Sequence, residues 1–313
     1  MSLKEELINE LSAAEGGWVN GEDFAKSHGV SRAAVWKAVK SIQKDGICVN
    51  AVRSKGYSLS ENCDILSCAA VKSKMKNKID VIYYPETDST NNRAKSLINS
   101  GLCRETLIVA NKQSAGRGRQ GKSFYSPADT GIYMSLIVFP NAPLQSAVSS
   151  TTAAAVAVCR AIERLCDVKV QIKWVNDVYA GNEKICGILT EAVTDFETQT
   201  VSAVVIGVGI NVTTSEFPQD VENAGSLCIN VKRSAIAAAV ADELLKVFNT
   251  PCSDFIEYYR SHSMIIGKNI VFIKNGEKRN ARALSIDENG GLEVMLENGG
   301  TTVLRSGEIT IRV

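Results

Sequence analysis

Residues 116–123 read GRGRQGKS, an octamer that matches two patterns for phosphate-binding loops. As G-x-x-x-x-G-K-S it matches a P-loop, and as G-x-G-x-x-G it matches a dinucleotide-binding fingerprint. Both patterns need a helix directly after the glycines, because the helix N-terminus holds the phosphates. Residues 124–138 instead read FYSPADTGIYMSLIV, in which Pro127 and Gly131 break a helix and an alternating apolar pattern then indicates a strand. The sequence therefore argues against a P-loop or Rossmann fold.

The octamer is better interpreted as a flexible loop between two strands. Arg117, Arg119 and Lys122 stand among its three glycines, so the loop can close over an anion. The alternative is a solvated hairpin without a ligand.

Composition narrows the class of protein. The 313 residues carry a net charge of +1, so any surface for nucleic acid must be local. The first residues, MSLKEELINELS, lack an apolar signal core, and the longest apolar stretch, 201–212, is too short to span a bilayer. We expect a cytoplasmic protein with no membrane partner. The nine cysteines form no C-x-x-C pair and lie mostly in apolar segments, such as Cys159, Cys166 and Cys186, which predicts buried free thiols.

The first sixty residues predict a winged helix-turn-helix. The expected elements are a helix that ends at Gly16, helices over 22–27 and 32–45, and strands over 47–52 and 57–59. Ser31 is placed to cap the third helix, and residues 53–56 join the two strands as a wing. In this layout the third helix enters the major groove of DNA and the wing contacts the backbone.

Charge on the third helix and the wing predicts a DNA-binding surface. Apolar residues within 35–42 face inward, while residues 26–55 hold seven basic side chains and one acid, Asp45. The alternative is a small helical domain whose lysines only solvate it. By residue type, Trp18 and Trp36 favour packing over base contacts. The residues expected at the DNA surface are Ser31, Arg32, Ala33, Trp36, Lys37, Lys40, Arg53 and Lys55.

The middle of the chain alternates strands and helices. Strands are expected over 80–84, 106–110, 170–174, 184–192 and 201–212, and helices over 92–100, 146–166 and 233–248. The short polar connection 195–200 favours an antiparallel pair between the strands on either side of it. An α+β domain with a mixed sheet fits this pattern.

From residue 266 the pattern changes to short alternating strands separated by Asn-Gly turns. They are expected over 269–273, 282–286, 292–296, 302–304 and 309–313, and the first turn is Asn275-Gly276. This spacing predicts a small β-barrel. The expected domains are therefore 1–62, 63–265 and 266–313.

Four further clusters accompany the cationic loop in the middle domain. They read DSTN at 88–91, KWVND at 173–177, KICGIL at 184–189 and GVGINV at 207–212. Together with GRGRQG, they resemble the biotin protein ligases, and the N-terminal domain makes the chain similar to the bifunctional members that also repress the biotin operon. The resemblance covers essentially the whole chain. It implies a winged helix, a central catalytic domain like that of class II synthetases, and a C-terminal SH3-like barrel.

The resemblance also implies a two-step reaction. The carboxylate of biotin attacks the α-phosphate of ATP, with Mg²⁺, to give biotinyl-5′-adenylate and pyrophosphate, and a lysine of the biotin carboxyl carrier protein then takes the biotinyl group. Joining two anions requires fixed cations, and a closing loop must keep water from the adenylate. In the family, the adenylate promotes a homodimer that presents two winged helices to a two-fold operator.

The residues that match the family's site are assigned by the same resemblance. Those expected to bind biotin are Ser89, Thr90, Asn91, Gln113, Arg117, Gly118, Arg119, Lys184, Gly187 and Gly209. Those expected to bind ATP are Arg119, Lys173, Trp174, Asn176 and Asn211. The expected catalytic residues are Arg117, Arg119, Lys184, which would hold the carboxylate or acyl phosphate, and Asp177, which would accept the incoming lysine's proton and ligate Mg²⁺.

Two positions depart from the family's pattern. Val175 replaces a common Pro, and Cys186 replaces a usual Ala. Taken alone, DSTN could be a helix N-cap, KWVND a strand that runs into a turn, and Gly207 and Gly209 packing glycines. Agreement among all five clusters makes these readings improbable together.

Three other functions compete with a bifunctional ligase and repressor. One is a biotin-sensing transcription factor without catalysis. Another is a P-loop nucleotidase, which requires a helix after Ser123. The third is a lipoate ligase, which is disfavoured because those enzymes lack the GRGRQG loop.

Overall fold

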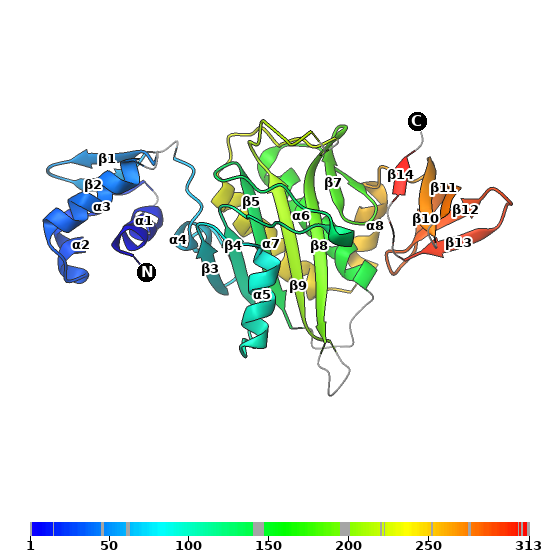
Figure 1. Cartoon of the computed structure of the whole chain (residues 1–313), viewed down its shortest axis with the longest axis horizontal. Coiled ribbons are helices and arrows are strands. Elements are labelled where there is room, and N and C mark those ends of the chain that lie inside the picture. The colour runs from blue at the N-terminus through cyan, green and yellow to red at the C-terminus, as the bar shows by residue number, and fades with distance from the viewer. Residues whose placement is uncertain are drawn as a thin grey trace.

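The computed structural model shows three bodies in a row along its long axis (Figure 1). It describes residues 2–14, 16–44, 47–60, 63–139, 147–194, 201–219, 221, 223–251, 253–274, 277–305, 307 and 309–311. The predicted features that lie outside these residues are Asp45, Ser146, the connection 195–200, the turn Asn275-Gly276 and residues 312–313 of the last strand. Within the described residues, no helix is long and apolar enough to cross a membrane.

The N-terminal body is a helix-turn-helix followed by a β-hairpin. Its elements are α1 (Leu3–Ala13), α2 (Gly21–Ser27), α3 (Arg32–Lys44), β1 (Val49–Val52) and β2 (Gly56–Leu59). Ser31 Oγ accepts a hydrogen bond from the Ala34 amide at 3.2 Å, which caps α3 as predicted. The predicted inner face of α3 is buried, with Val35, Val39 and Ile42 at most 2% exposed.

The hairpin β1–β2, called the wing below, is held against the segment that connects α1 to α2. Val19 and Tyr57 form an antiparallel bridge. Gly56 adopts φ +100°, and a Cβ at this position would collide with the carbonyl oxygen of Val19. Glycine is therefore required where the wing turns back toward the helices.

The central body is built on a seven-stranded mixed sheet. Its strands are β3 (Asp80–Tyr84), β4 (Thr106–Ala110), β5 (Gly131–Val138), β6 (Gln171–Lys173), β7 (Asp177–Ala180), β8 (Glu183–Thr194) and β9 (Val201–Asn211). The order is β3-β4-β5-β9-β8-β7-β6. Only β3 and β4 pair in parallel, and β8 and β9 form the predicted antiparallel pair. Strand β7 was not predicted, because four residues after Asn176 are too few to display an alternating pattern.

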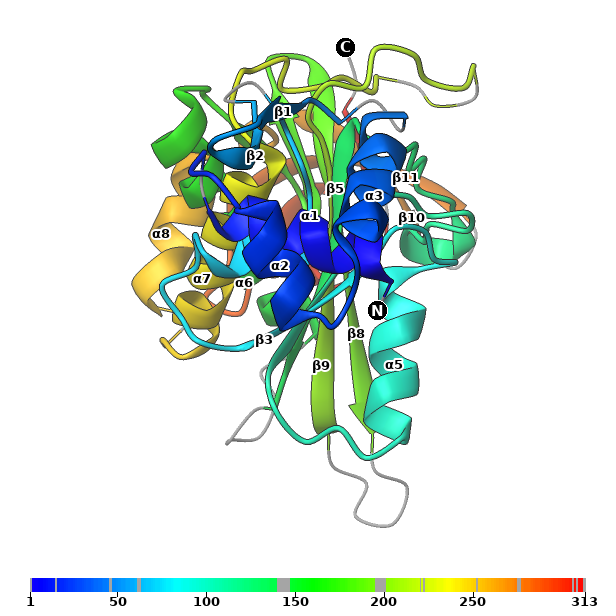
Figure 2. The same ribbon diagram turned by 90° about the vertical axis from the view of Figure 1, so that its left-hand side faces the viewer.

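Helices cover the two faces of this sheet unequally (Figure 2). One face packs on α4 (Cys68–Lys72), α6 (Ala147–Cys166), α7 (Arg233–Phe248) and α8 (Ser253–Ser261), and the other on α5 (Thr90–Asn99). All eight residues of β5 are buried, so the alternation in its sequence does not mark a solvent face. The nine-residue helix α8 was not predicted, since its apolar residues extend over little more than two turns.

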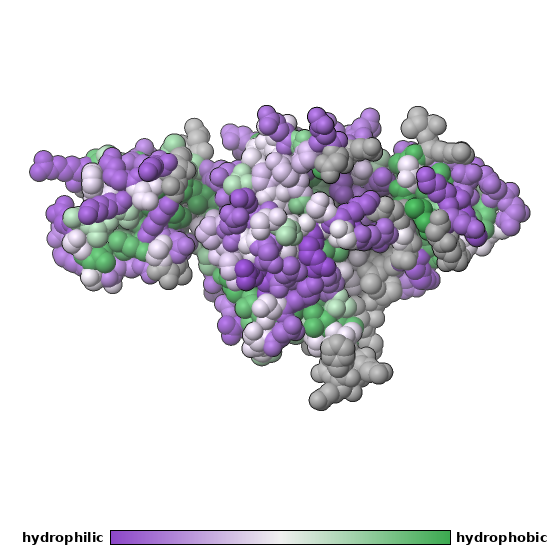
Figure 3. Space-filling view, viewed as in Figure 1, coloured by the Kyte–Doolittle hydropathy of each residue, from purple (hydrophilic) through white to green (hydrophobic). Residues whose placement is uncertain are grey.

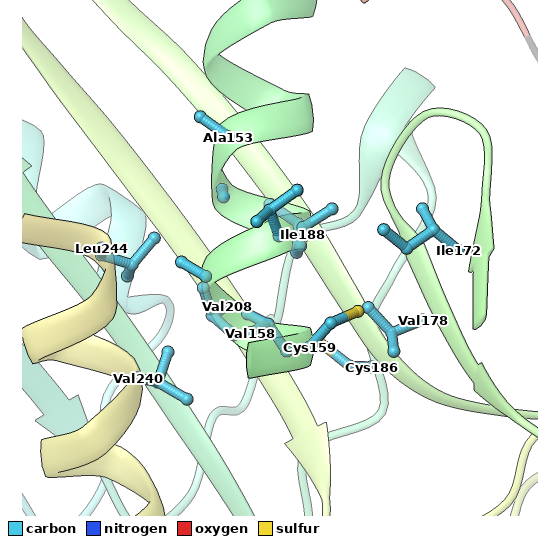
Figure 4. Packing of buried hydrophobic residues seen from close by; sticks show 14 of the residues in the cluster. Ala153, Val158, Cys159, Ile172, Val178, Cys186, Ile188, Val208, Val240 and Leu244 are labelled. Carbon is cyan, nitrogen blue, oxygen red and sulfur yellow. The ribbon is translucent and has the colours of Figure 1, made fainter. Parts of the chain in front are cut away.

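The larger core lies on the side of α6 and α7. Val158 and Cys159 of α6 and Val240 of α7 meet Ile188 and Val208 of the sheet (Figure 4). Cys186 is also fully buried there, so its thiol packs in place of the smaller Ala expected from the family.

The prediction that most cysteines are buried was wrong. Of the eight described, only Cys159 and Cys186 are buried, and all eight are free thiols. Burial raises the pKa of the Cys166 thiol to about 11 although it is only partly buried. Apolar neighbours in sequence did not place the other thiols inside, because several lie at the ends of elements.

The C-terminal body is an antiparallel sheet of five strands, all predicted. They are β10 (Asn269–Lys274), β11 (Glu277–Ile286), β12 (Leu292–Leu296), β13 (Thr301–Leu304) and β14 (Ile309–Ile311), in the order β13-β12-β11-β10-β14. Two side chains of the central body bond its backbone. Trp174 Nε1 donates to the Gly290 carbonyl at 2.9 Å, and Arg260 Nε donates to the Ile286 carbonyl at 2.7 Å.

Candidate active site

Three glycines on adjacent strands form a flat area on the α5 side of the central sheet. Gly187 of β8 pairs with Gly209 of β9, and Gly207 lies two residues before Gly209 on the same face. We call these residues the glycine shelf. A Cβ on Gly207 would overlap Asn91 Oδ1, and a Cβ on Gly209 would overlap the ring of Phe124. The shelf is therefore a place of close approach rather than loose packing.

The N-terminus of α5 meets the shelf through a chain of polar side chains. Ser135 Oγ, fully buried on β5, lies 2.7 Å from Thr90 Oγ1 and 2.6 Å from Asn91 Oδ1. Gln113 Oε1 accepts from the Thr90 amide at 2.8 Å. The Ser89 side chain makes no capping hydrogen bond to α5. Thr90 and Asn91 of the DSTN cluster thus belong to a polar network with Ser135 and Gln113, which a plain helix N-cap would not form.

Residues 112–126, which we call the lid, form most of the connection from β4 to β5 beside the shelf. The Phe124 amide donates to the Gly116 carbonyl at 2.8 Å, and the Gly118 amide donates to the Lys122 carbonyl at 2.7 Å. A short 3₁₀ turn, Arg119–Gly121, forms the tip. No helix occurs between Ser123 and Phe139, all of which are described, which confirms the argument from sequence against a P-loop.

Two predicted cations meet the KWVND cluster at one edge of the shelf. Arg119 Nη1 donates to Asn176 Oδ1 at 3.0 Å, and Lys184 Nζ lies 2.8 Å from Asp177 Oδ1. The Lys184 and Asp177 side chains are 31% and 21% exposed, so a ligand can reach them. Residues from GRGRQG, KWVND and KICGIL therefore converge, although Arg119 and Asn176 are 57 positions apart in sequence.

The other residues of KWVND point elsewhere. Lys173 Nζ lies 5.8 Å from the ring centroid of Tyr179. Trp174 is 3% exposed, and its indole N–H is bound to Gly290, which ties it to the C-terminal sheet. The Trp174–Val175 peptide bond is cis. The contributions of Lys173 and Trp174 to ATP binding stay predictions.

Asn211, at the end of β9, has a buried oxygen without a partner. Its Nδ2 donates to the Gly225 carbonyl at 3.0 Å. Its Oδ1 has no hydrogen-bond donor among the described atoms, and the residue is only 5% exposed, so water has little access to this oxygen. The neighbouring chain is fixed by the Lys184 amide, which donates to the Asn223 carbonyl at 2.6 Å. An orphaned acceptor costs about 1–3 kcal/mol, so it suits an N–H group of a ligand.

Arg117, another cation of the lid, has a partner that the sequence analysis missed. Arg117 Nη1 lies 3.0 Å from each carboxylate oxygen of Glu191 and 3.2 Å from Asn92 Oδ1. Burial acts to raise the pKa of Glu191, but bonds from Asn91 and Lys95 and the charges of Lys95 and Arg117 hold it below its usual value of 4.5. Ser135, Phe124 and Glu191 were all missed. Glu191 shares its strand face with Gly187, so alternation along β8 could have indicated it.

The residues predicted to contact DNA all lie on the outside of the N-terminal body. They are Ser31, Arg32, Ala33, Trp36, Lys37, Lys40, Arg53 and Lys55. The loop that joins β1 and β2 protrudes as a hydrophilic tip (Figure 3). Trp18 and Trp36, which were expected to favour packing over base contacts, are instead 39% and 53% exposed, with Lys55 near the ring of Trp18 and Lys40 near that of Trp36. The exposed rings of both tryptophans are therefore accessible to a bound partner such as DNA.

Two family models match this chain. The Biotin/lipoate A/B protein ligase family matches residues 83–211, which include the lid, the glycine shelf and Asn211. An HTH domain model matches residues 4–58, which include α3 and nearly all of the wing.

Relatives align over nearly the full length. Bifunctional ligase/repressor BirA of Bacillus subtilis (strain 168) is 33% identical over 324 aligned positions, which cover 99% of each chain. The protein of the same name from Escherichia coli (strain K12) is 27% identical over 96% of this chain and 94% of that one. In fold, the chain is similar to the biotin protein ligase from Aquifex aeolicus in complex with biotin and ATP, with a TM-score of 0.64 and 24% identity over 75% of this chain and 99% of that one.

The fold and the site thus define a two-function class of protein, in which a helix-turn-helix domain is joined to a ligase domain on a mixed sheet. Within this class, the chain belongs to the family of bifunctional biotin protein ligases and repressors. Its C-terminal region is β-rich, as the fold shows.

Proposed function

We propose that this protein joins biotin to ATP as biotinyl-5′-adenylate, with release of pyrophosphate, and then transfers the biotinyl group to a lysine of a biotin carboxyl carrier protein. The observation that carries the proposal is the convergence of Arg119, Lys184, Asn176 and Asp177 beside the glycine shelf. Fixed cations there lower the cost of bringing a carboxylate against a phosphate, because they do not have to reorganise during the reaction.

In this proposal biotin lies on the glycine shelf, with its ureido end toward α5. Thr90, Asn91 and Gln113 are buried or half-buried polar groups within one hydrogen-bonded chain, which suits a small polar head on an apolar body. The remaining residues assigned to biotin are Ser89, Arg117, Gly118, Arg119, Lys184, Gly187 and Gly209.

Lys184 and Asp177 take complementary roles. Lys184 holds the carboxylate and then the acyl phosphate, since its ammonium can leave Asp177 for a ligand oxygen without breaking a fixed geometry. Asp177 then accepts the proton of the incoming lysine.

ATP is assigned to Arg119, Lys173, Trp174, Asn176 and Asn211. The unpartnered Oδ1 of Asn211 fits the exocyclic amino group of adenine, which donates N–H. Mg²⁺ commonly binds one carboxylate together with the phosphates of its nucleotide. The described residues hold no group of three potential metal ligands, and Asp177 is the carboxylate that could ligate an ion carried by ATP, supplying charge neutralisation at the phosphates.

The N-terminal body is proposed to bind operator DNA through α3 and the wing, as a homodimer that forms when the adenylate is bound. Its exposed cations and its match to an HTH model support this. The protein would act in the cytoplasm, where ATP, DNA and the carrier occur together.

We further propose that the five C-terminal strands form an SH3-like barrel, that the central domain is related to class II synthetases, and that the domains are 1–62, 63–265 and 266–313.

The ligase proposal is tested by biotin-dependent exchange of labelled pyrophosphate into ATP, followed by transfer of labelled biotin to a carrier domain. Both activities are expected. Exchange without transfer would indicate an adenylate-based sensor, and the absence of both from folded protein would overturn the proposal.

The repressor proposal is tested by DNA binding with and without biotin plus ATP. Binding to operator DNA is expected to tighten when both ligands are present. Lys55→Ala, on the wing, should weaken binding to all sequences alike and lower the salt dependence by about one counterion. Operator binding that ignores both ligands would contradict the proposed coupling.

A further inference from the structure

The three cations around the glycine shelf are not placed alike. Arg119 and Lys184 contact the KWVND cluster, at one end of the shelf. Arg117 contacts Glu191 of β8, at the α5 end. The lid is therefore held at two separate points, through Arg119 and through Arg117.

Glu191 collects more donors than an ordinary surface carboxylate. It accepts from Asn91 Nδ2 at 2.9 Å, from Lys95 Nζ at 3.0 Å and from Arg117 Nη1 at 3.0 Å. Its side chain is 20% exposed, and the three donors come from α5 and the lid. Charge-assisted bonds in a partly buried position are stronger than exposed ion pairs.

The same carboxylate sets the orientation of the Asn91 amide. Because Glu191 and the Leu189 carbonyl are both acceptors, Asn91 Nδ2 must face them, and Oδ1 then faces Ser135. From Ser135 the polar chain continues to Thr90 and Gln113. Glu191 thus links Arg117 of the lid to the polar side chains beneath the proposed biotin site.

We infer that Glu191 is a positioning residue that clamps the lid over the bound acyl-adenylate and fixes Asn91 beneath biotin. The inference rests on the proposed ligase function. Glu191 is not a general base, since two cations neutralise it. Its task is to retain the adenylate, in which the acyl–phosphate bond would otherwise break by attack of water, giving biotin and AMP. We call Glu191, Asn91, Lys95 and Arg117 the lid clamp.

The test compares how the full-length wild type and Glu191→Gln divide the adenylate between release and retention. Each protein is incubated with biotin and labelled ATP without a carrier, then passed through a desalting column, and released and protein-bound biotinyl-adenylate are measured over time. The ratio of released to bound adenylate should rise about tenfold in Glu191→Gln, which corresponds to the loss of one charge-assisted interaction. Glu191→Asp, which keeps the charge on a shorter arm, should restore part of the retention.

Glu86→Gln is the matched control, because Glu86 forms an exposed ion pair 3.2 Å long with Lys112 at the root of the lid. It should retain adenylate like the wild type. A double variant, Glu191→Gln with Arg117→Gln, should leak no faster than the faster single variant if the two residues act as one unit.

The outcomes separate the two proposals. A wild type that makes no adenylate overturns the proposed function. A wild type and a Glu191→Gln variant that both make adenylate and release it equally overturn the lid clamp alone. If Glu191→Gln does not fold, Lys95→Gln is measured in its place, because Lys95 bonds Glu191 at 3.0 Å and is assigned to no ligand; a rise in release supports the clamp, and wild-type retention overturns it.

Discussion

On strand β9, Ile206 packs in the core shared with α6 and α7, whereas the next residue, Gly207, faces Asn91 of α5. The same contrast holds along β8, where Ile188 lies in that core and Gly187 lies under Phe124. Successive side chains of a strand point to opposite faces, so one strand can carry an apolar face packed in the core and a second, more polar face on which glycines admit the close approach of Asn91 and Phe124. The packed face stabilises the sheet. The other face can therefore carry glycines, which contribute no side chain to the core, at the proposed ligand site.

The largest effect is expected from a cation on the polar face. Lys184→Ala removes the charge nearest to the proposed acyl phosphate and should slow adenylate formation on the order of 10²- to 10³-fold. Single-turnover formation of biotinyl-adenylate measures this loss. Lys112→Ala, an exposed lysine in an ion pair with Glu86, serves as the control. A loss of less than about fivefold for Lys184→Ala would remove this residue from the chemistry.

A smaller but still large effect is expected at the glycine shelf. The Cβ of Gly207→Ala would displace the Asn91 amide from Ser135 and Glu191, so the Kd for biotin should rise by about ten- to a hundredfold. Isothermal titration of biotin measures the change. Normal affinity in this variant would mean that biotin binds elsewhere.

The neighbouring substitution on the packed face should behave in the opposite way. Ile206→Val removes one methylene from a fully buried side chain and should lower the free energy of unfolding by about 0.5–1.5 kcal/mol. Denaturant unfolding measures the loss, and the Kd for biotin should not change. If Ile206→Val altered biotin binding as much as Gly207→Ala, the division between the two faces would be wrong.

The smallest effect concerns pH. The pKa of Glu191 is held below its ordinary value, so its ionised form contributes stability above that ordinary range, and the contribution falls as pH drops through the lowered pKa. The difference in unfolding free energy between the wild type and Glu191→Gln should be constant from pH 7 to about pH 5 and should shrink below that. A difference that grows as pH falls would mean that Glu191 is destabilised in the folded state.

Local patterns predicted most of the fold. The alternation of Ile132, Met134 and Leu136 indicated β5, and capping by Ser31 indicated the start of α3. The same patterns could not show that helices cover both faces of β5, which buries Ser135 next to Thr90. Burial on a second face depends on segments that are distant in the chain, and periodicity does not report them.

The site was predictable where residues form a motif and not where they meet only in space. Arg119 and Lys184 stand in recognisable clusters and lie where a ligand can reach them. Arg117 and Glu191 are 74 positions apart, so nothing in either local sequence pairs them. The pairing arises because α5, the lid and β8 meet at one end of the sheet.

The central claim is that an acyl-adenylate forms on the glycine shelf, between α5 and the lid. A crystal structure of this protein with biotin and ATP tests it most directly. The account predicts density for biotinyl-5′-adenylate over Gly207 and Gly209, with its acyl phosphate at Lys184 and its adenine at Asn211. Density for the ligand on the α6–α7 side of the sheet, or at a place that Lys184 cannot reach, would contradict it.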